Sequence, residues 1–294
     1  MSKKQRNLRQ KIAKTLVSVF VLAVFMVPLF MTARWVSGIV GDHDPRKVTE
    51  VALLQTRPID QTSAPLEPFN QPIITITFDD GWESVYTNAL PTLQRNGLKT
   101  TQYLISGIFD NPSYMSIKQI QSMQKAGHEV GGHTASHADL TMLDDQQLNY
   151  ELVDSQTALS KNFGAVVDFT SPYGAYNAHT LKMIGQHYRS QKNAEGDPAA
   201  NELEAINIRS GFNALNIKSY SVRKTTTIDD LKKLIKAAQD HNGWLILTYH
   251  QIDDSDDLYA VTPVVFEQQM ELVSISNVRS ATVGEVFKAI GRSR

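Results

Sequence analysis

The chain has 294 residues, of which 41% are hydrophobic and 20% charged, a composition typical of globular proteins rather than disordered segments. It contains no cysteine, so disulfides and thiolate metal sites are excluded, and any metal must be held by histidine and carboxylate ligands. Up to residue 34 there are seven basic residues and no acidic one, which leaves 22 basic and 30 acidic residues in the remainder. This acidic balance argues against a nucleic-acid partner, because binding phosphates requires a basic surface.

The N-terminus carries an uncharged run from Thr15 to Ala33, preceded by six basic residues and followed by Arg34 and Trp35. As a helix, this run would span roughly 28 Å, close to the ~30 Å thickness of the hydrocarbon layer. The positive flank places the N-terminus in the cytoplasm and the rest of the chain outside. Residues 1–35 are therefore predicted to be a basic tail and a single-pass membrane anchor at the cell membrane. A cleaved signal peptide, which would release a secreted protein, is the main alternative, and a buried helix of a soluble domain is a weaker one.

Residues 36–70 are predicted to be a linker, because they contain four prolines, scattered charge and little periodicity. Residues 71–294 are predicted to form one domain in which strands and helices alternate. Strands are expected at 73–78, 100–105, 128–133, 166–169, 244–249 and near 278. Helices are expected at 82–96, 116–127, 144–159, 177–184, 227–240, 264–273 and 283–290. Residues 188–225 show only short strands and turns.

This alternation favours a parallel α/β architecture. About seven short strands fit a distorted, incomplete (β/α) barrel better than an open doubly wound sheet. No glycine-rich loop follows the first strand, which weakens the case for a dinucleotide-binding fold. In a barrel, functional residues gather at the C-terminal ends of the strands, and polar clusters follow four of the predicted strands.

The first polar cluster is Asp79-Asp80-Gly81, which ends the apolar, β-branched run Ile73–Phe78. Two adjacent carboxylates at the end of a buried strand repel each other and lose hydration, so a cation is needed to compensate. An ordinary Asp-Gly turn is the alternative interpretation.

The second cluster holds His133 and His137, whose i, i+4 spacing suits capture of a metal ion by two imidazoles. Three of the eight histidines lie between residues 128 and 137. Two histidines and one carboxylate, with an open position for water, are typical of catalytic zinc. A pair of surface histidines without a ligand is the alternative.

The third and fourth clusters follow two later strands. The turn Thr170-Ser171-Pro172-Tyr173-Gly174 can present a backbone amide as an oxyanion donor, although an ordinary turn fits these residues equally well. His250 follows the apolar run Trp244–Tyr249, where an imidazole suits general acid catalysis or a structural role.

Taken together, the motifs resemble those of the NodB-homology polysaccharide deacetylases, carbohydrate esterase family four. The matching segments are Thr77-Phe78-Asp79-Asp80-Gly81, His133-x-x-x-His137, Pro172-Tyr173-Gly174 and Leu245-x-Leu247-x-x-His250. Their order agrees with the family over residues 73 to about 290. The resemblance implies a distorted (β/α) barrel and a divalent-metal hydrolase that removes N-acetyl or O-acetyl groups from sugars.

Position by position, the resemblance implies Asp79 as general base and His250 as the acid that protonates the leaving amine. The backbone amide of Tyr173 would help to hold the oxyanion. The implied metal ligands are Asp80, His133 and His137. The implied metal is zinc, with Co²⁺, Ni²⁺ or Mn²⁺ as alternatives, because such a donor set accepts several divalent ions. His128, which precedes the ligand pair, is interpreted as structural.

Two departures from the family pattern affect the acid-base groups. Thr170 occupies the position at which many members carry an arginine that orients the base. The Asp-Trp motif that tunes the acid histidine is also absent, with Arg189 and Asp197 as candidate replacements.

The leading hypothesis is a membrane-anchored deacetylase that acts outside the cytoplasmic membrane on an N-acetylglucosamine-containing polysaccharide. Peptidoglycan, chitin-like chains and exopolysaccharides are the candidate substrates. The alternatives are a catalytically weak glycan-binding domain of the cell envelope and an amidase acting on a lipid-linked sugar.

Overall fold

The computed structural model describes residues 65–109, 111–193 and 201–292. The predicted membrane anchor, most of the predicted linker and Asp197 lie outside these residues. Among the described residues, no helix has the length and apolar character needed to cross a membrane. The described residues belong to one compact unit, Asp60–Arg294.

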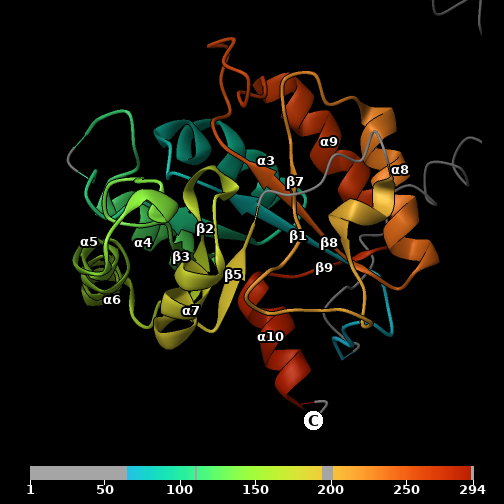
Figure 1. The fold of residues 1–294 in the computed structure, drawn as a ribbon. Coiled ribbons are helices and arrows are strands. Elements are labelled where there is room, and N and C mark those ends of the chain that lie inside the picture. Colours follow the sequence, from blue (N-terminus) through green and yellow to red (C-terminus); the bar gives the residue numbers. More distant parts are fainter. Residues whose placement is uncertain (1–64, 110, 194–200, 293–294) are drawn as a thin grey trace, which may run out of the picture. The chain divides into compact units, whose positions relative to one another are not determined.

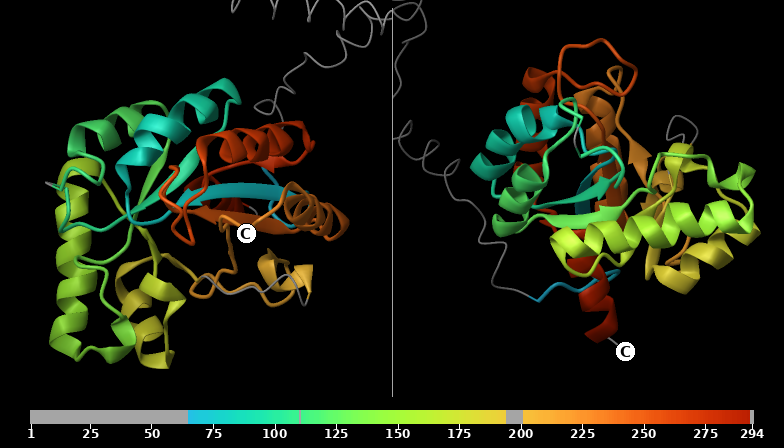
Figure 2. Two further views of the ribbon diagram at one scale, coloured as in Figure 1. Left: turned by 90° about the horizontal axis from the view of Figure 1, so that it is seen from above. Right: turned by 90° about the vertical axis from the view of Figure 1, so that its left-hand side faces the viewer.

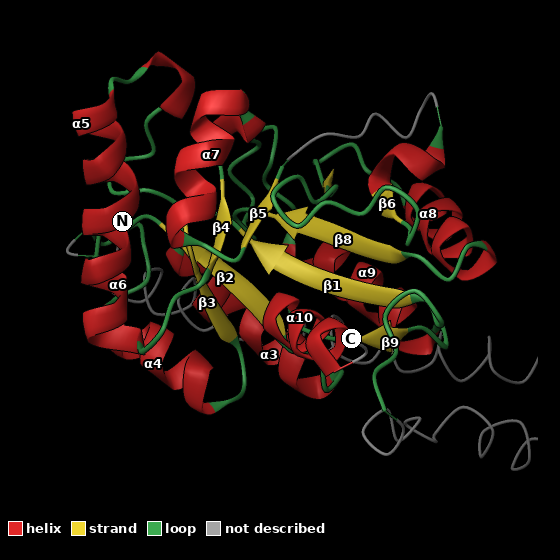
Figure 3. Ribbon diagram, turned by 60° about the horizontal axis from the view of Figure 1, so that its bottom comes forward, coloured by secondary structure: helices red, strands yellow, loops and turns green. Residues whose placement is uncertain are grey.

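Nine strands form a single sheet in the described part of the chain (Figure 3). Its order is β5-β4-β3-β2-β1-β8-β6, with β7 paired to β8 and β9 to β1, and β6 is antiparallel to β8. The β5 edge meets the segment before β7 through an isolated bridge between Lys192 and Ile217 and a hydrogen bond from the Gln191 amide to the Ala214 carbonyl. The predicted incomplete barrel of largely parallel strands is therefore confirmed. The strands are β1 (Ile73–Phe78), β2 (Thr100–Leu104), β3 (Glu129–Gly132), β4 (Asp168–Thr170), β5 (Ser190–Lys192), β6 (Ile206–Asn207), β7 (Tyr220–Ser221), β8 (Trp244–Tyr249) and β9 (Arg279–Ser280).

The helices lie close to the predicted positions, and Ser116, Asp144, Asn177 and Thr227 cap four of them through reciprocal capping boxes. The run from α5 through η3 to α6 forms one long helical rod with a π-helical turn in its middle (Figure 2). The main helices are η1 (Val85–Ala89), α3 (Leu90–Arg95), α4 (Ile117–Lys125), α5 (Asp145–Asn149), η3 (Tyr150–Asp154), α6 (Ser155–Phe163), α7 (Ala178–His187), α8 (Ile228–Asp240), α9 (Pro263–Ile275) and α10 (Val283–Arg292). The short turns are η2 (Leu140–Met142), η4 (Pro172–Gly174) and η5 (Glu202–Ala205).

Strand β1 is buried on both faces, so its side chains alternate between two apolar environments. The even-numbered residues from Ile74 to Phe78 belong to the large core under the outer helices. On the inner face, Ile73 packs with Trp244 and with Val283 and Val286 of α10. Figure 1 shows α10 on the opposite side of the sheet from α3 and α9.

This alternation aims the residues that follow the strands into the barrel. Thr77 points inward, where its hydroxyl donates to that of Thr248 on β8, and the register pairs these two residues. Asp79 and His250 each lie two residues further along, on the same inner face. The parallel register therefore brings two of the predicted clusters together at the C-terminal end of the sheet.

Candidate metal centre

Asp80, His133 and His137 come together at this end of the barrel, although they follow two different strands. The three candidate donor atoms lie within 4.8 Å of one another. Asp80 Oδ1 is 3.4 Å from His133 Nε2 and 3.3 Å from His137 Nε2. The structure thus assembles the three residues that the sequence singled out as metal ligands.

The environment of Asp80 fits a bound cation. Its Oδ1 atom is buried and has no hydrogen-bond partner among the described residues. A buried, unpartnered carboxylate oxygen facing two imidazole nitrogens is costly unless a cation satisfies it. Two imidazoles and one carboxylate form a donor set that zinc and other first-row divalent ions accept.

Other groups around the triad orient the candidate ligands. His133 Nδ1 lies 2.8 Å from the Thr170 carbonyl oxygen, and donation to that oxygen leaves Nε2 free to bind a metal. Trp82 Nε1 donates to Asp80 Oδ2 over 2.9 Å, so Oδ1 is the oxygen turned toward the histidines. The Trp82 ring stacks on Tyr114 at a centroid distance of 4.7 Å. Sequence reasoning placed Trp82 only at the start of a helix and missed this contact.

Glu151 holds the loop that carries His137. Its Oε2 accepts hydrogen bonds from the backbone amides of Ala135 and Ser136 over 2.8 and 3.0 Å, and its Oε1 accepts from Ser136 Oγ over 2.6 Å. Glu151 lies in the π-helical turn η3 and is only 5% exposed. No sequence signal indicates this role beyond an acidic residue on a predicted helix.

Backbone strain is concentrated at the same place. Eight described non-glycine residues have a positive φ, and four of them are at the site: Asp80, Thr134, His137 and Tyr173. Each costs about 1–2 kcal/mol relative to an ordinary conformation. Such residues persist only where surrounding contacts hold them, which is typical of pre-organised functional sites.

The electrostatics of the triad are dominated by mutual attraction. Burial opposes ionisation of Asp80, but the close approach of His133, with further help from His250 and His137, holds its pKa well below the usual range. Burial also opposes a charge on His133, yet Asp80, Asp79 and the Thr170 carbonyl raise the pKa of this imidazole. Burial and the neighbouring His133 lower the pKa of His137. An anionic carboxylate facing two imidazoles is the state that favours cation binding.

Asp79, the candidate base, is buried and is not part of the triad. Its Oδ2 accepts a hydrogen bond from Lys192 Nζ over 3.0 Å, whereas its Oδ1 is buried and has no partner among the described residues. Sequence reasoning missed Lys192, because it lies in the segment 188–225 that gave no clear pattern.

His250, the candidate acid, lies beside Tyr259, with the ring centroids 4.8 Å apart and the ring planes tilted by 37°. Its Nδ1 is buried and lacks a partner among the described residues. Burial lowers the pKa of His250, and the charges of Asp79 and Asp80 partly oppose that shift. The imidazole is therefore within the electrostatic reach of both carboxylates.

Tyr173 lies in the turn η4 with φ 59° and ψ 6°. Its side chain is 71% exposed, and its ring packs edge-on against His137 at 4.6 Å. The structure thus brings this turn to the triad as well. The proposed role of its backbone amide stays a prediction.

The other sequence candidates lie elsewhere. Arg189 forms a two-pronged ion pair with the buried Asp168 and lies over the Phe287 ring of α10, so its contacts are to groups other than His250. His128 is buried with Nδ1 2.8 Å from Thr100 Oγ1, which agrees with a structural role.

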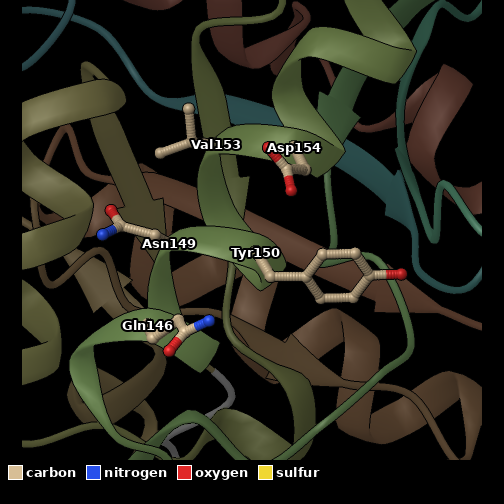
Figure 4. A pocket seen from close by; sticks show the side chains of 5 residues that line it. All are labelled: Gln146, Asn149, Tyr150, Val153 and Asp154. Atoms are coloured by element: carbon tan, nitrogen blue, oxygen red, sulfur yellow. The ribbon is translucent and has the colours of Figure 1, made fainter.

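A surface pocket lies on α5 and η3 and shares no residue with the triad (Figure 4). It is lined by Gln146, Asn149, Tyr150, Val153 and Asp154.

Comparison with known proteins identifies the domain. Residues 67–188 match the family model described as polysaccharide deacetylase. This segment is a polysaccharide deacetylase domain. It contains the triad, Asp79 and Tyr173, while Lys192 and His250 lie beyond the matched residues of the deacetylase domain.

Individual relatives support this assignment. A chitin deacetylase of Pestalotiopsis sp is 33% identical over 111 residues, which cover 37% of this chain and 37% of that protein. The peptidoglycan-N-acetylglucosamine deacetylase PgdA of Listeria monocytogenes is 31% identical over 115 residues, or 38% of this chain and 24% of that protein. This chain therefore spans well under half the length of these curated relatives.

A solved structure supports the fold of the deacetylase domain. The Xyl-CE4 domain of a multidomain xylanase from the hindgut metagenome of Trinervitermes trinervoides has a TM-score of 0.53 and 23% identity. The similarity covers 76% of this chain and 92% of that domain. At this level of identity the match establishes the shared fold alone.

Proposed function

We propose that this chain is a divalent-metal-dependent hydrolase that removes acetyl groups from an N-acetylglucosamine-containing polysaccharide. The observation that carries the proposal is the triad of Asp80, His133 and His137 with an unpartnered oxygen of Asp79 beside it. The proposed substrate class follows the printed names of the relatives, one a chitin deacetylase and one a peptidoglycan-N-acetylglucosamine deacetylase.

Asp80, His133 and His137 would hold the metal. A divalent cation bound there supplies a Lewis acid that activates water and polarises a carbonyl group. Zinc is the proposed ion, and Co²⁺, Ni²⁺ or Mn²⁺ fit the same donors.

The remaining groups of the site would move protons and bind the acetyl group. Asp79 Oδ1, which is buried and unpartnered, accepts the proton of the attacking water. His250, once protonated, donates a proton to the leaving amine of the sugar. The backbone amide of Tyr173, in its left-handed turn, donates a hydrogen bond to the developing oxyanion.

We further propose that the deacetylase domain acts outside the cytoplasmic membrane, tethered by residues 1–35. The support is the uncharged run from Thr15 to Ala33 with its basic flank. Protease added to intact cells should digest residues beyond 36 and spare a short N-terminal fragment in the membrane fraction. Full protection of the chain until the cells are lysed would contradict this location.

The activity is tested by measuring released acetate. The purified full chain, loaded with zinc or cobalt, is mixed with acetylated chito-oligosaccharides, peptidoglycan and acetylated exopolysaccharide. We expect release from at least one of them and none after removal of the metal. Glycan binding without acetate release would favour the alternative of a catalytically weak binding domain. Release only from lipid-linked sugars would favour the amidase alternative.

A further inference from the structure

Lys192 is a buried cation in the interior of the barrel. Its side chain is 1% exposed, and its Nζ lies 3.0 Å from Asp79 Oδ2 and 3.1 Å from Thr248 Oγ1. The ammonium also lies 5.3 Å from the centroid of the Tyr103 ring. Removing an ammonium from water is costly unless it is paired, and Asp79 is the anion that pairs with it here.

The contact depends on the curl of the sheet. In strand order, β5 is four strands away from β1, so a flat sheet would separate them by roughly 19 Å at about 4.8 Å per strand. A lysine side chain could not bridge such a gap. In this barrel, Lys192 at the end of β5 instead reaches Asp79 at the end of β1 and Thr248 on β8.

Strand β4 does not supply a cation to Asp79 at the position next to Lys192. Thr170 is its register partner on β4, and the Thr170 hydroxyl donates to the Lys192 backbone carbonyl over 3.1 Å. The Thr170 side chain is thus committed to the strand pair, and it carries no charge. Lys192 supplies the cation that contacts the candidate base.

The ion pair with Lys192 gives the two oxygens of the Asp79 carboxylate different environments. Lys192 binds Oδ2, while Oδ1 is buried without a partner among the described residues. One oxygen is therefore fixed, and the other is available to accept a proton. Asp79 directly precedes Asp80, a member of the candidate ligand triad, so its carboxylate lies at the same end of the barrel as the candidate metal centre.

We propose that Lys192 is the positioning residue for Asp79, fixing the carboxylate through Oδ2 so that Oδ1 accepts the proton of the attacking water. This inference rests on the proposed function, because it assigns a role within that reaction. Lys192 acts through Asp79 and does not itself exchange a proton with the substrate. Its contribution should therefore disappear when Asp79 can no longer act as a base.

The test compares Lys192→Met and Lys192→Arg in the full zinc-loaded chain. Methionine keeps an unbranched side chain without the charge, and arginine restores a cation. Lys224→Met is the matched control, because Lys224 forms an exposed ion pair with Asp256. For each variant we would measure zinc affinity, thermal unfolding, and the kcat and KM of acetate release.

We expect Lys192→Met to lower kcat about 100-fold while KM and zinc affinity stay within about threefold of wild type. Lys192→Arg should regain at least tenfold of the loss, and Lys224→Met should match wild type. A kcat for Lys192→Met within threefold of wild type, or an arginine variant no better than methionine, would overturn the inference.

A double variant separates positioning from general structural support. If Lys192 acts through Asp79, adding Lys192→Met to Asp79→Asn should change the residual kcat less than threefold. This variant also removes both partners of the buried ion pair, so it leaves no buried charge unpaired if Lys192→Met alone fails to fold. A further loss of ten-fold or more would overturn the positioning role. A zinc-loaded wild-type chain that releases no acetate from any glycan would overturn both this inference and the proposed function.

Discussion

Glu151 allows the pre-organisation of the metal centre to be tested by a single substitution. The change is Glu151→Ala, which removes the carboxylate that accepts from the Ala135 and Ser136 amides and from the Ser136 hydroxyl. Hydrogen bonds to a charged group are worth about 1.5–3 kcal/mol each, so three of them supply about 4.5–9 kcal/mol.

Those bonds hold a strained loop. Thr134 and His137 both have positive φ, at a cost of about 1–2 kcal/mol each, or roughly 2–4 kcal/mol for the loop. The bond from the His137 amide to Thr134 Oγ1 survives the substitution, but on its own it offsets only part of the strain. Without Glu151 the loop is expected to relax, which moves His137 away from Asp80.

We therefore expect Glu151→Ala to weaken zinc binding by about 10–100-fold, the range found when groups supporting metal ligands are removed. The assay is a zinc titration against a competing chelator, with urea unfolding of the metal-free protein alongside it. Asp154→Asn, an exposed change in the same helical turn, is the control and should leave both unchanged. Destabilisation by Glu151→Ala with zinc affinity within twofold of wild type would refute the reasoning.

Two further predictions concern other contacts. Trp82→Phe keeps an aromatic ring beside Tyr114 but removes the N–H that donates to Asp80 Oδ2. Zinc affinity, measured by calorimetric titration, should therefore fall roughly tenfold. An unchanged zinc affinity would contradict an orienting role for Trp82. Burial, with a contribution from Asp168, raises the pKa of Glu129 from 4.5 to about 7, so between these pH values the folded chain holds a proton that the unfolded chain has lost. Stability in urea should therefore fall as pH rises from about 4.5 to 7, by up to about 1.4 kcal/mol per pH unit, and Glu129→Gln should flatten this fall. Parallel curves for the two proteins would contradict the prediction.

Local sequence signals were sufficient for much of the fold. The apolar runs of β1 and β8 are buried along their whole length, and both were predicted with the observed bounds. The sequence predicts helix starts at Ser116, Asp144 and Asn177, and each of these residues caps its helix. These signals work because the apolar run of a buried strand and the capping side chain of a helix are each contained in a few consecutive residues.

The ligand set was also predictable, since Asp80, His133 and His137 follow strands whose C-terminal ends meet. Lys192 was not predictable, because β5 has only three residues and its contact with Asp79 depends on the curl of the whole sheet. Glu151 was missed for a related reason: its contacts with the 134–137 loop cross from one element to another, and helical periodicity carries no information about them. Arg189 is a sequence candidate for tuning the acid histidine, but in the structure it pairs with Asp168, a buried acidic residue of β4.

The central claim is that the adjacent carboxylates of Asp79 and Asp80 have different roles. The most direct measurement is acetate release by the zinc-loaded Asp79→Asn variant, with its zinc content determined on the same sample. The account predicts wild-type zinc occupancy together with a loss of kcat of at least about 100-fold, because Asp79 moves a proton and does not hold the metal. Acetate release at the wild-type rate, or loss of zinc along with activity, would contradict it.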